Sequence, residues 1–125
     1  MAIPGTPSAS PVPATGPVPL ALRHCRPLGQ DAALDVAAVD ALLQHLPQWR
    51  VEGGYLGRIF TFADHWETMA FVNATAWITH REDHHPELAI GYDRCQVRFI
   101  THSVGGLSEN DFICAAKFDA LLALC

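Results

Sequence analysis

Two prolines and two glycine pairs punctuate residues 31–125. Pro47 and Pro86 cannot lie inside a helix, because proline lacks the backbone N–H that a helix requires. The pair Gly53-Gly54 permits the positive backbone angles of a tight hairpin, and Gly105-Gly106 breaks the chain again. Between these breaks the apolar residues recur at helical or at strand spacing. The punctuation therefore predicts helices that alternate with hairpins.

Three segments have the periodicity of helices, and they cover residues 31–46, 64–83 and 108–122. Asp31, Asp64 and Ser108 are the expected N-caps, the last two in boxes of capping type. Phe71 and Trp77 belong to the expected apolar face of the second helix. The third helix is apolar over more than one stripe, so we expect its second face to be buried against another subunit.

Four short segments read as strands, and they cover residues 49–52, 55–62, 88–92 and 95–102. Each consecutive pair should form an antiparallel hairpin. The expected fold class is α+β: a four-stranded antiparallel sheet with three helices packed on one face, in the order α-β-β-α-β-β-α.

The N-terminal segment has a different composition. Seven of the nine prolines lie within the first 27 residues, among Ala, Gly, Ser and Thr. Such a segment buries too little apolar surface to order itself. We therefore expect residues 1–30 to be a flexible Pro-rich tail and residues 31–125 to be one folded domain.

Charge and cysteine usage narrow the class of protein. Thirteen acidic and eight basic residues give a net charge of -5 without a cluster of Lys and Arg, which argues against nucleic acid or an anionic membrane surface as partner. No apolar run approaches the roughly 20 residues of a membrane span. The four cysteines form no CxxC pair and no secretory signal is recognisable, so we expect a cytoplasmic protein with reduced thiols.

Histidines concentrate around the sequence HREDHHPEL and the strand that follows it: His80, His84, His85 and His102. Pro86 disfavours helical geometry at His85, so the adjacent pair should lie in the turn that leaves the second helix, with both rings at a pocket edge. His102, near the end of its strand, could converge with them. Histidine donates or accepts protons near neutral pH, which makes these residues candidates for acid and base catalysis.

Two other interpretations compete with catalysis by these histidines. In the first, the adjacent His-His before proline is merely a polar end of the helix. In the second, the histidines bind zinc, because His80 and His84 have the i, i+4 spacing of a helical ligand pair. However, Arg81 stands where HExxH metalloproteases carry glutamate, and no finger-like cysteine spacing is present, so we expect no metal site. The sequence has neither a GxSxG elbow nor a catalytic-cysteine context, so we do not expect a nucleophilic enzyme.

The spacing of these residues resembles a known signature: His80, three residues, His84-His85-Pro86, five residues, Tyr92, nine residues, His102, eight residues, Asp111. The sequence resembles the pterin-4a-carbinolamine dehydratases from about residue 42 to residue 122. Trp49 and the Arg58-x-Phe60-x-Phe62 strand belong to the same resemblance. Trp77 departs from it, since relatives commonly carry smaller or acidic residues nearby.

The resemblance implies an activity and a site. Members of this family dehydrate the 4a-carbinolamine that aromatic amino acid hydroxylases leave on their tetrahydropterin, without metal or organic cofactor. His84, His85 and His102 correspond to the active-site trio, with His84 and His102 expected to transfer protons and His85 to bind substrate or make the opposite proton step. Pro86 and Thr101 are expected to shape the pterin pocket.

The remaining signature positions are expected to support the trio. Asp83 could orient an imidazole or be a solvated carboxylate at a helix end. Asp111 could assist the site, although its place in a capping box favours a structural role. His80 is expected behind the site or at the surface. The resemblance also implies a homodimer or homotetramer and a functional link to phenylalanine hydroxylase, and it leaves a non-catalytic dimerisation cofactor as the alternative function.

Overall fold

The computed structural model describes residues 18–124. Its helices and strands are α1 (Val36–Leu43), β1 (Arg50–Glu52), β2 (Tyr55–Thr61), α2 (His65–Glu82), β3 (Glu87–Ile90), β4 (Arg94–Phe99) and α3 (Glu109–Leu122). All strand pairs are antiparallel, and the sheet order is β1-β2-β4-β3. The predicted α+β fold class and element order are confirmed.

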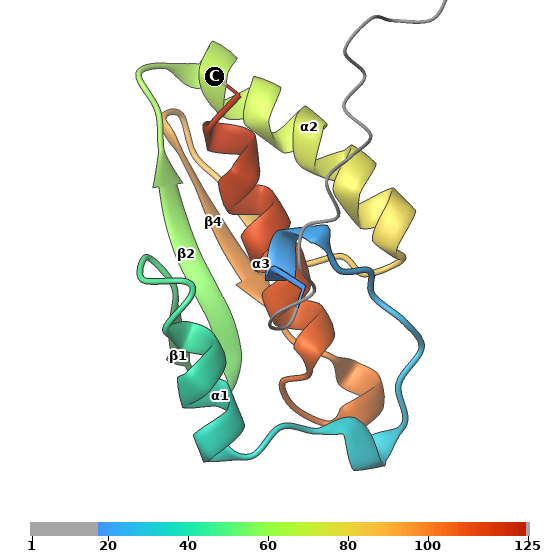
Figure 1. Ribbon diagram of the computed structural model, residues 1–125. Helices are drawn as coiled ribbons and strands as arrows, with labels where there is room; N and C mark the ends of the chain where they lie inside the picture. The colour runs from blue at the N-terminus through green and yellow to red at the C-terminus, as the bar shows by residue number, and fades with distance from the viewer. Residues whose placement is uncertain (1–17, 125) are drawn as a thin grey trace, which may run out of the picture.

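Helices α2 and α3 lie across one face of this sheet, and α1 lies near β1 (Figure 1). The core fills the space between the sheet and the helices. Phe60 of β2, Phe99 of β4 and Phe118 of α3 are buried there, and the ring centroids of Phe99 and Phe118 are 5.2 Å apart. Burial of each such side chain contributes roughly 1.5–3 kcal/mol, so these aromatic contacts hold the helix layer on the sheet.

The first hairpin turns where the glycine pair predicts it. Gly53 has a φ of 60° and Gly54 a φ of 84°, backbone angles that residues with a Cβ rarely adopt. The turn sets the register of the hairpin, in which Glu52 pairs with Tyr55.

Helix α1 begins later than the sequence predicts. Asp35, not Asp31, is its N-cap, and the Asp35 carboxylate accepts a hydrogen bond from the Ala38 N–H at 2.8 Å. The N–H of Leu34 donates to the carbonyl oxygen of Leu107 at 2.9 Å, which ties the preceding chain to the loop before α3. Asp31 lies instead in a 3-10 turn over Gln30–Ala32.

The buried side of α2 also differs from the prediction. Phe71 is buried as expected, but Trp77 is 73% exposed. The buried stripe passes instead through Thr68 and Thr75, whose hydroxyls donate to backbone carbonyls and so lose little on leaving water. Polar residues with local partners gave no hydrophobic signal. The predicted face therefore includes the buried Phe71 and the core-packed Ile78 but is wrong at Trp77.

Residues 18–30, which we call the N-terminal strap, pack on α3. Figure 1 shows the short turn over Leu20–Leu22 lying across α3. Leu20 is buried in the core cluster, and the Lys117 ammonium donates to the carbonyl oxygen of Ala21 at 2.8 Å. The strap, which belongs to the tail predicted for residues 1–30, thus has defined contacts with α3, and residues 1–17 of that tail lie outside the described residues.

The turn over Leu20–Leu22 lies against α3 and covers part of its apolar surface. The expected contact of α3 with another subunit stays a prediction. Within residues 18–124, no helix is both long and apolar enough to cross a bilayer.

Candidate active site

A buried carboxylate, Asp111, lies at the centre of the predicted site. It is in the first turn of α3 and is 0% exposed. Its Oδ1 is 2.6 Å from Nε2 of His84, and its Oδ2 accepts hydrogen bonds from the Thr101 hydroxyl at 2.8 Å and the Ser108 N–H at 3.0 Å. A buried carboxylate needs such partners because desolvation of an unpaired charge is costly. Asp111 thus joins the helix cap, the end of the sheet and a histidine.

The capping box predicted at Ser108 is present. The Ser108 hydroxyl accepts from the Asn110 N–H at 3.2 Å, while the Asp111 carboxylate accepts from Ser108 N–H. The same Ser108 hydroxyl is 2.7 Å from the Thr101 hydroxyl. The structural role expected for Asp111 is therefore real, but the same carboxylate also contacts His84.

The chain reaches His84 through an unusual turn. Asp83 ends α2 with a φ of 50°, which is left-handed geometry, and the His84 N–H donates back to the Thr79 carbonyl at 3.2 Å. Aspartate tolerates this region better than most residues with a Cβ. The His84 ring then stacks on Phe99, with centroids 5.8 Å apart and planes 11° apart.

This turn separates the adjacent histidines. The side chain of His84 is only 13% exposed, so its ring points inward, whereas His85 is exposed. His84 is thus the more buried of the two, with Nε2 held by Asp111. A carboxylate that holds one ring nitrogen fixes the orientation of the imidazole, and it leaves Nδ1 as the nitrogen available for proton transfer.

His102 lies at the other side of the Asp111 network. It is the first residue of a 3-10 turn over His102–Val104 and is exposed, directly after Thr101. Thr101 itself is buried and turns its hydroxyl toward Asp111 and Ser108. Thr101 therefore helps to position the carboxylate, and its expected place beside the pterin stays a prediction.

The other predicted site residues lie outside this network. Asp83 and His80 are exposed, and Pro86 is half-buried after the histidine pair. Asp83 acts through its backbone conformation at the end of α2. Across residues 18–124, no three His, Cys, Asp or Glu side chains gather in an arrangement that could hold a metal ion.

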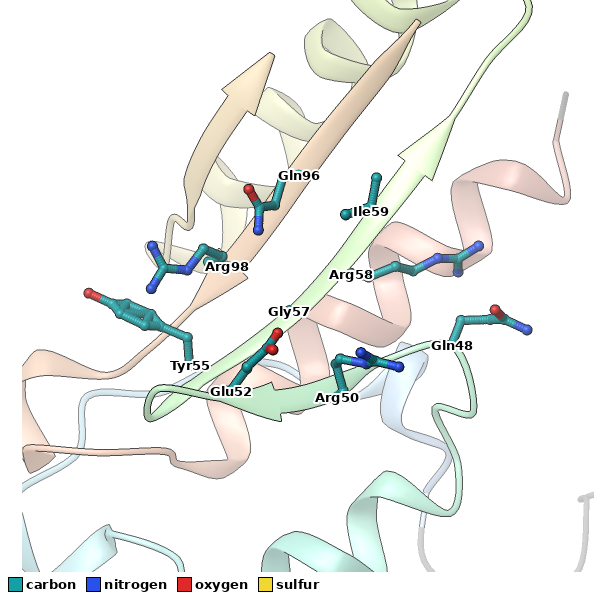
Figure 2. A pocket seen from close by; sticks show the side chains of 9 residues that line it. All are labelled: Gln48, Arg50, Glu52, Tyr55, Gly57, Arg58, Ile59, Gln96 and Arg98. Atoms are coloured by element: carbon teal, nitrogen blue, oxygen red, sulfur yellow. The ribbon is translucent and has the colours of Figure 1, made fainter. Parts of the chain in front are cut away.

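The uncovered face of the sheet carries a separate hollow of about 280 Å³. Figure 2 shows Arg50, Tyr55 and Arg98 around it, with Arg98 stacked 3.9 Å from the centre of the Tyr55 ring. None of the signature residues lines this hollow. It is therefore distinct from the candidate site at the ends of α2 and β4.

The chain resembles known proteins over most of its length. Residues 32–121 match the family described as pterin 4 alpha carbinolamine dehydratase. The chain belongs to this family. Its members are hydro-lyases, so the expected family and enzyme class are confirmed.

Relatives of the dehydratase family match beyond that range. A protein of Stenotrophomonas maltophilia named as a pterin-4-alpha-carbinolamine dehydratase is 59% identical over 107 residues, which cover 83% of this chain and 92% of the relative. One of Nitrosospira multiformis with the same name is 48% identical over 106 residues, covering 84% and 94%. A crystal structure of a transcriptional coactivator/pterin dehydratase from Brucella melitensis has a TM-score of 0.69 and 30% identity, covering 71% of this chain and 97% of its own.

The dehydratase signature omits residues that the structure places at the site. Phe99 supports the His84 ring, and Ser108 holds Asp111. The Ser108 signal was visible as a capping box, but nothing in the sequence linked that box to a histidine. The whole strap lies before the family match, which begins at residue 32.

Proposed function

We propose that this chain dehydrates 4a-hydroxytetrahydrobiopterin to quinonoid dihydropterin and water by histidine acid and base catalysis. One observation carries the proposal. The buried Asp111 contacts both His84 and Thr101. The next residue in the chain after each of them is an exposed histidine, His85 and His102 respectively. The family membership supplies the substrate class.

The reaction needs two proton movements. The 4a-hydroxyl must gain a proton to leave as water, and the neighbouring ring nitrogen must lose one, so an acid and a base are required around the same pterin. His84 and His102 are assigned to proton transfer, and His85 to substrate binding or the opposite proton step. Pro86 fixes the chain directly after His85 and limits where that ring can lie.

The assignment is tested by stopped-flow absorbance with chemically generated 4a-hydroxytetrahydropterin. Wild-type protein, chelator-treated protein and His84→Ala are compared with the uncatalysed reaction, and the exposed His45→Ala is the matched control. Chelator-resistant acceleration that is lost in His84→Ala but kept in His45→Ala is expected. No acceleration from folded wild-type protein would overturn the proposal.

The substrate implies a place in metabolism. We propose that an aromatic amino acid hydroxylase, such as phenylalanine hydroxylase, supplies the carbinolamine, and that the chain works with it in the cytoplasm to recycle tetrahydrobiopterin. In a coupled reaction with limiting tetrahydropterin, adding the chain should raise the rate of hydroxylation. An unchanged rate would refute the link while leaving the isolated dehydration intact.

The exposed tryptophans of α2 support a homo-oligomer, either a dimer or a tetramer. Trp66 is 84% and Trp77 73% exposed, and their spacing of eleven residues places them on the same side of the helix. Large aromatic side chains are enriched in interfaces. Sedimentation of wild-type protein should show an oligomer that Trp77→Asp weakens, and a wild-type monomer would contradict this proposal.

The alternative is a non-catalytic dimerisation cofactor for another protein. The Brucella melitensis relative is named both coactivator and dehydratase, and exposed tryptophans suit a protein partner as well as a second copy. Folded protein without dehydratase activity would favour this alternative.

A further inference from the structure

The strap is fixed to the protein on both sides of Cys25. The Cys25 N–H donates to Oε1 of Glu82 at 2.7 Å, which ties the strap to the last turn of α2. The Asn110 side chain donates to the Arg26 carbonyl at 2.7 Å and accepts from the Arg26 N–H at 3.2 Å. These contacts place the Cys25 side chain against α3 without a covalent link.

Two thiols meet at this contact. The sulfurs of Cys25 and Cys114 are 3.5 Å apart, although the residues are 89 positions apart in the sequence. Cys25 is half-buried at the edge of the strap, whereas Cys114 is buried on α3. A disulfide has an S–S distance of about 2.0 Å, so the two sulfurs would have to approach by about 1.5 Å to form the bond.

We propose that Cys25 and Cys114 form a reversible dithiol site, which hydrogen peroxide or a small organic disulfide oxidises to a disulfide that locks the strap onto α3. This inference is independent of the proposed dehydratase activity, because it concerns only the thiols and their contacts.

The order of oxidation follows from exposure. Cys25 is the more accessible thiol, and the hydrogen bond with Cys25 together with burial raises the pKa of the Cys114 thiol well above its ordinary value. The Cys25 thiolate therefore attacks peroxide first: its sulfur takes one oxygen to become a sulfenic acid, and the released hydroxide combines with the former thiol proton as water.

The second step closes the bond. The Cys114 sulfur attacks the sulfenic sulfur, the S–O bond breaks, and the departing hydroxide takes the Cys114 proton as water. The two thiols have then lost two electrons and two protons to the peroxide. With a small disulfide as oxidant, Cys25 first forms a mixed disulfide, and Cys114 expels the small thiol.

The site is close to the buried histidine. Cys114 lies one turn after Asp111 on α3, and its sulfur is 3.9 Å from the carbonyl oxygen of His84. The thiol of Cys25 contacts the Asn110 carbonyl at 3.6 Å. Oxidation replaces both thiol contacts with a covalent bond on the helix that carries Asp111.

Peptide mapping of the full chain tests the proposal. The four cysteines fall in four different tryptic peptides, which cover residues 24–50, 95–98, 99–117 and 118–125. After treatment of reduced protein with hydrogen peroxide or oxidised glutathione, we expect peptides 24–50 and 99–117 to be joined, with a mass lower by two hydrogens, and dithiothreitol to separate them. Oxidation of Cys25 without this crosslink, a crosslink to another cysteine or the absence of any crosslink would overturn the proposal.

Variants and melting measurements provide independent checks. Cys25→Ser should abolish the crosslink, and Cys95→Ser, which changes a buried thiol in β4, is the matched control that should retain it. The oxidised wild type should melt at least about 5 °C above the reduced protein, because a disulfide that closes so long a loop restricts the unfolded chain. An equal shift in Cys25→Ser would contradict the assignment.

Discussion

His84 and His85 are neighbours in the chain, yet their side chains lie in opposite surroundings. The His84 ring is stacked on Phe99 and held by a carboxylate that is itself buried, while His85 is exposed, as is His102. The left-handed turn at Asp83 produces the difference, because it directs the chain inward at His84. The site thus has an anchored histidine and two exposed ones.

The comparison separates two kinds of requirement. The anchored part, defined as His84, Thr101, Ser108 and Asp111, is built from hydrogen bonds that also cap α3 and tie it to the end of the sheet. Changes there should affect both the fold and the reaction. The exposed histidines contribute little buried contact, so changes to them should affect the reaction alone.

The largest effect is expected for Asp111→Ala. Removal of the carboxylate takes the hydrogen-bond partner away from the Ser108 N–H and the His84 ring, and it leaves the Thr101 hydroxyl with Ser108 alone. The free energy of unfolding should fall by about 3–5 kcal/mol, and dehydration should be lost. Urea denaturation and stopped-flow rates measure the two losses. A variant that keeps wild-type stability would show that the anchored part does not support the fold.

The second effect is the loss of the anchored imidazole. His84→Ala should reduce the dehydration rate roughly 10²-fold to 10⁴-fold, the range over which a positioned acid or base contributes. His84→Gln keeps a polar side chain of similar length and should lower activity as much while disturbing stability less. Comparable activity in His84→Gln and the wild type would remove His84 from the proton-transfer step.

Smaller effects are expected at the exposed histidines. His85→Gln and His102→Gln should each slow dehydration roughly tenfold or more, with stability changed by less than about 0.5 kcal/mol. The same urea and stopped-flow measurements apply, with His45→Gln as control. A stability loss equal to that of Asp111→Ala would erase the distinction between anchored and exposed histidines.

The smallest effect is expected for Glu82, the α2 carboxylate that holds the strap. Burial raises the pKa of Glu82, but hydrogen bonds from the Cys25 N–H and His24 and the charge of Lys117 outweigh it, so the pKa lies below its ordinary value of 4.5. The folded state therefore gains stability from this carboxylate above the ordinary value and loses it as the pH falls through the folded pKa.

Glu82→Gln tests this stabilisation. It should cost about 1–2 kcal/mol at neutral pH, and the difference from the wild type should shrink in acid below about pH 4.5. Urea unfolding across pH 3 to 7 measures it, with the exposed Glu67→Gln as control. A difference that stays constant with pH would mean that the strap is not held by the charge of Glu82.

Local sequence signals predicted much of this architecture. The glycine pair set the first hairpin, Asp64 and Ser108 marked helix starts, and Pro86 separated α2 from β3. These features depend on residues within a few positions of one another, so a single sequence reveals them.

Long-range contacts were not predictable in the same way. The strap directly follows five prolines in residues 1–17, so composition assigns it to the same tail. Leu20 and Cys25 nevertheless have partners in the core and on α2 and α3. The extra apolar stripe of α3 predicted a covering partner, and the contact of the strap with α3 could not be predicted from that stripe. The contact of His84 with Asp111 likewise joins residues that are 27 positions apart.

Asp111 also affects how related sequences should be interpreted. A relative can retain this carboxylate and its threonine and serine partners solely to keep α3 capped, even after its chemistry has been lost. Retention of these three residues is then weak evidence for a functioning enzyme. We expect the exposed residues at positions 85 and 102 to be the ones that distinguish an active homologue from a scaffold.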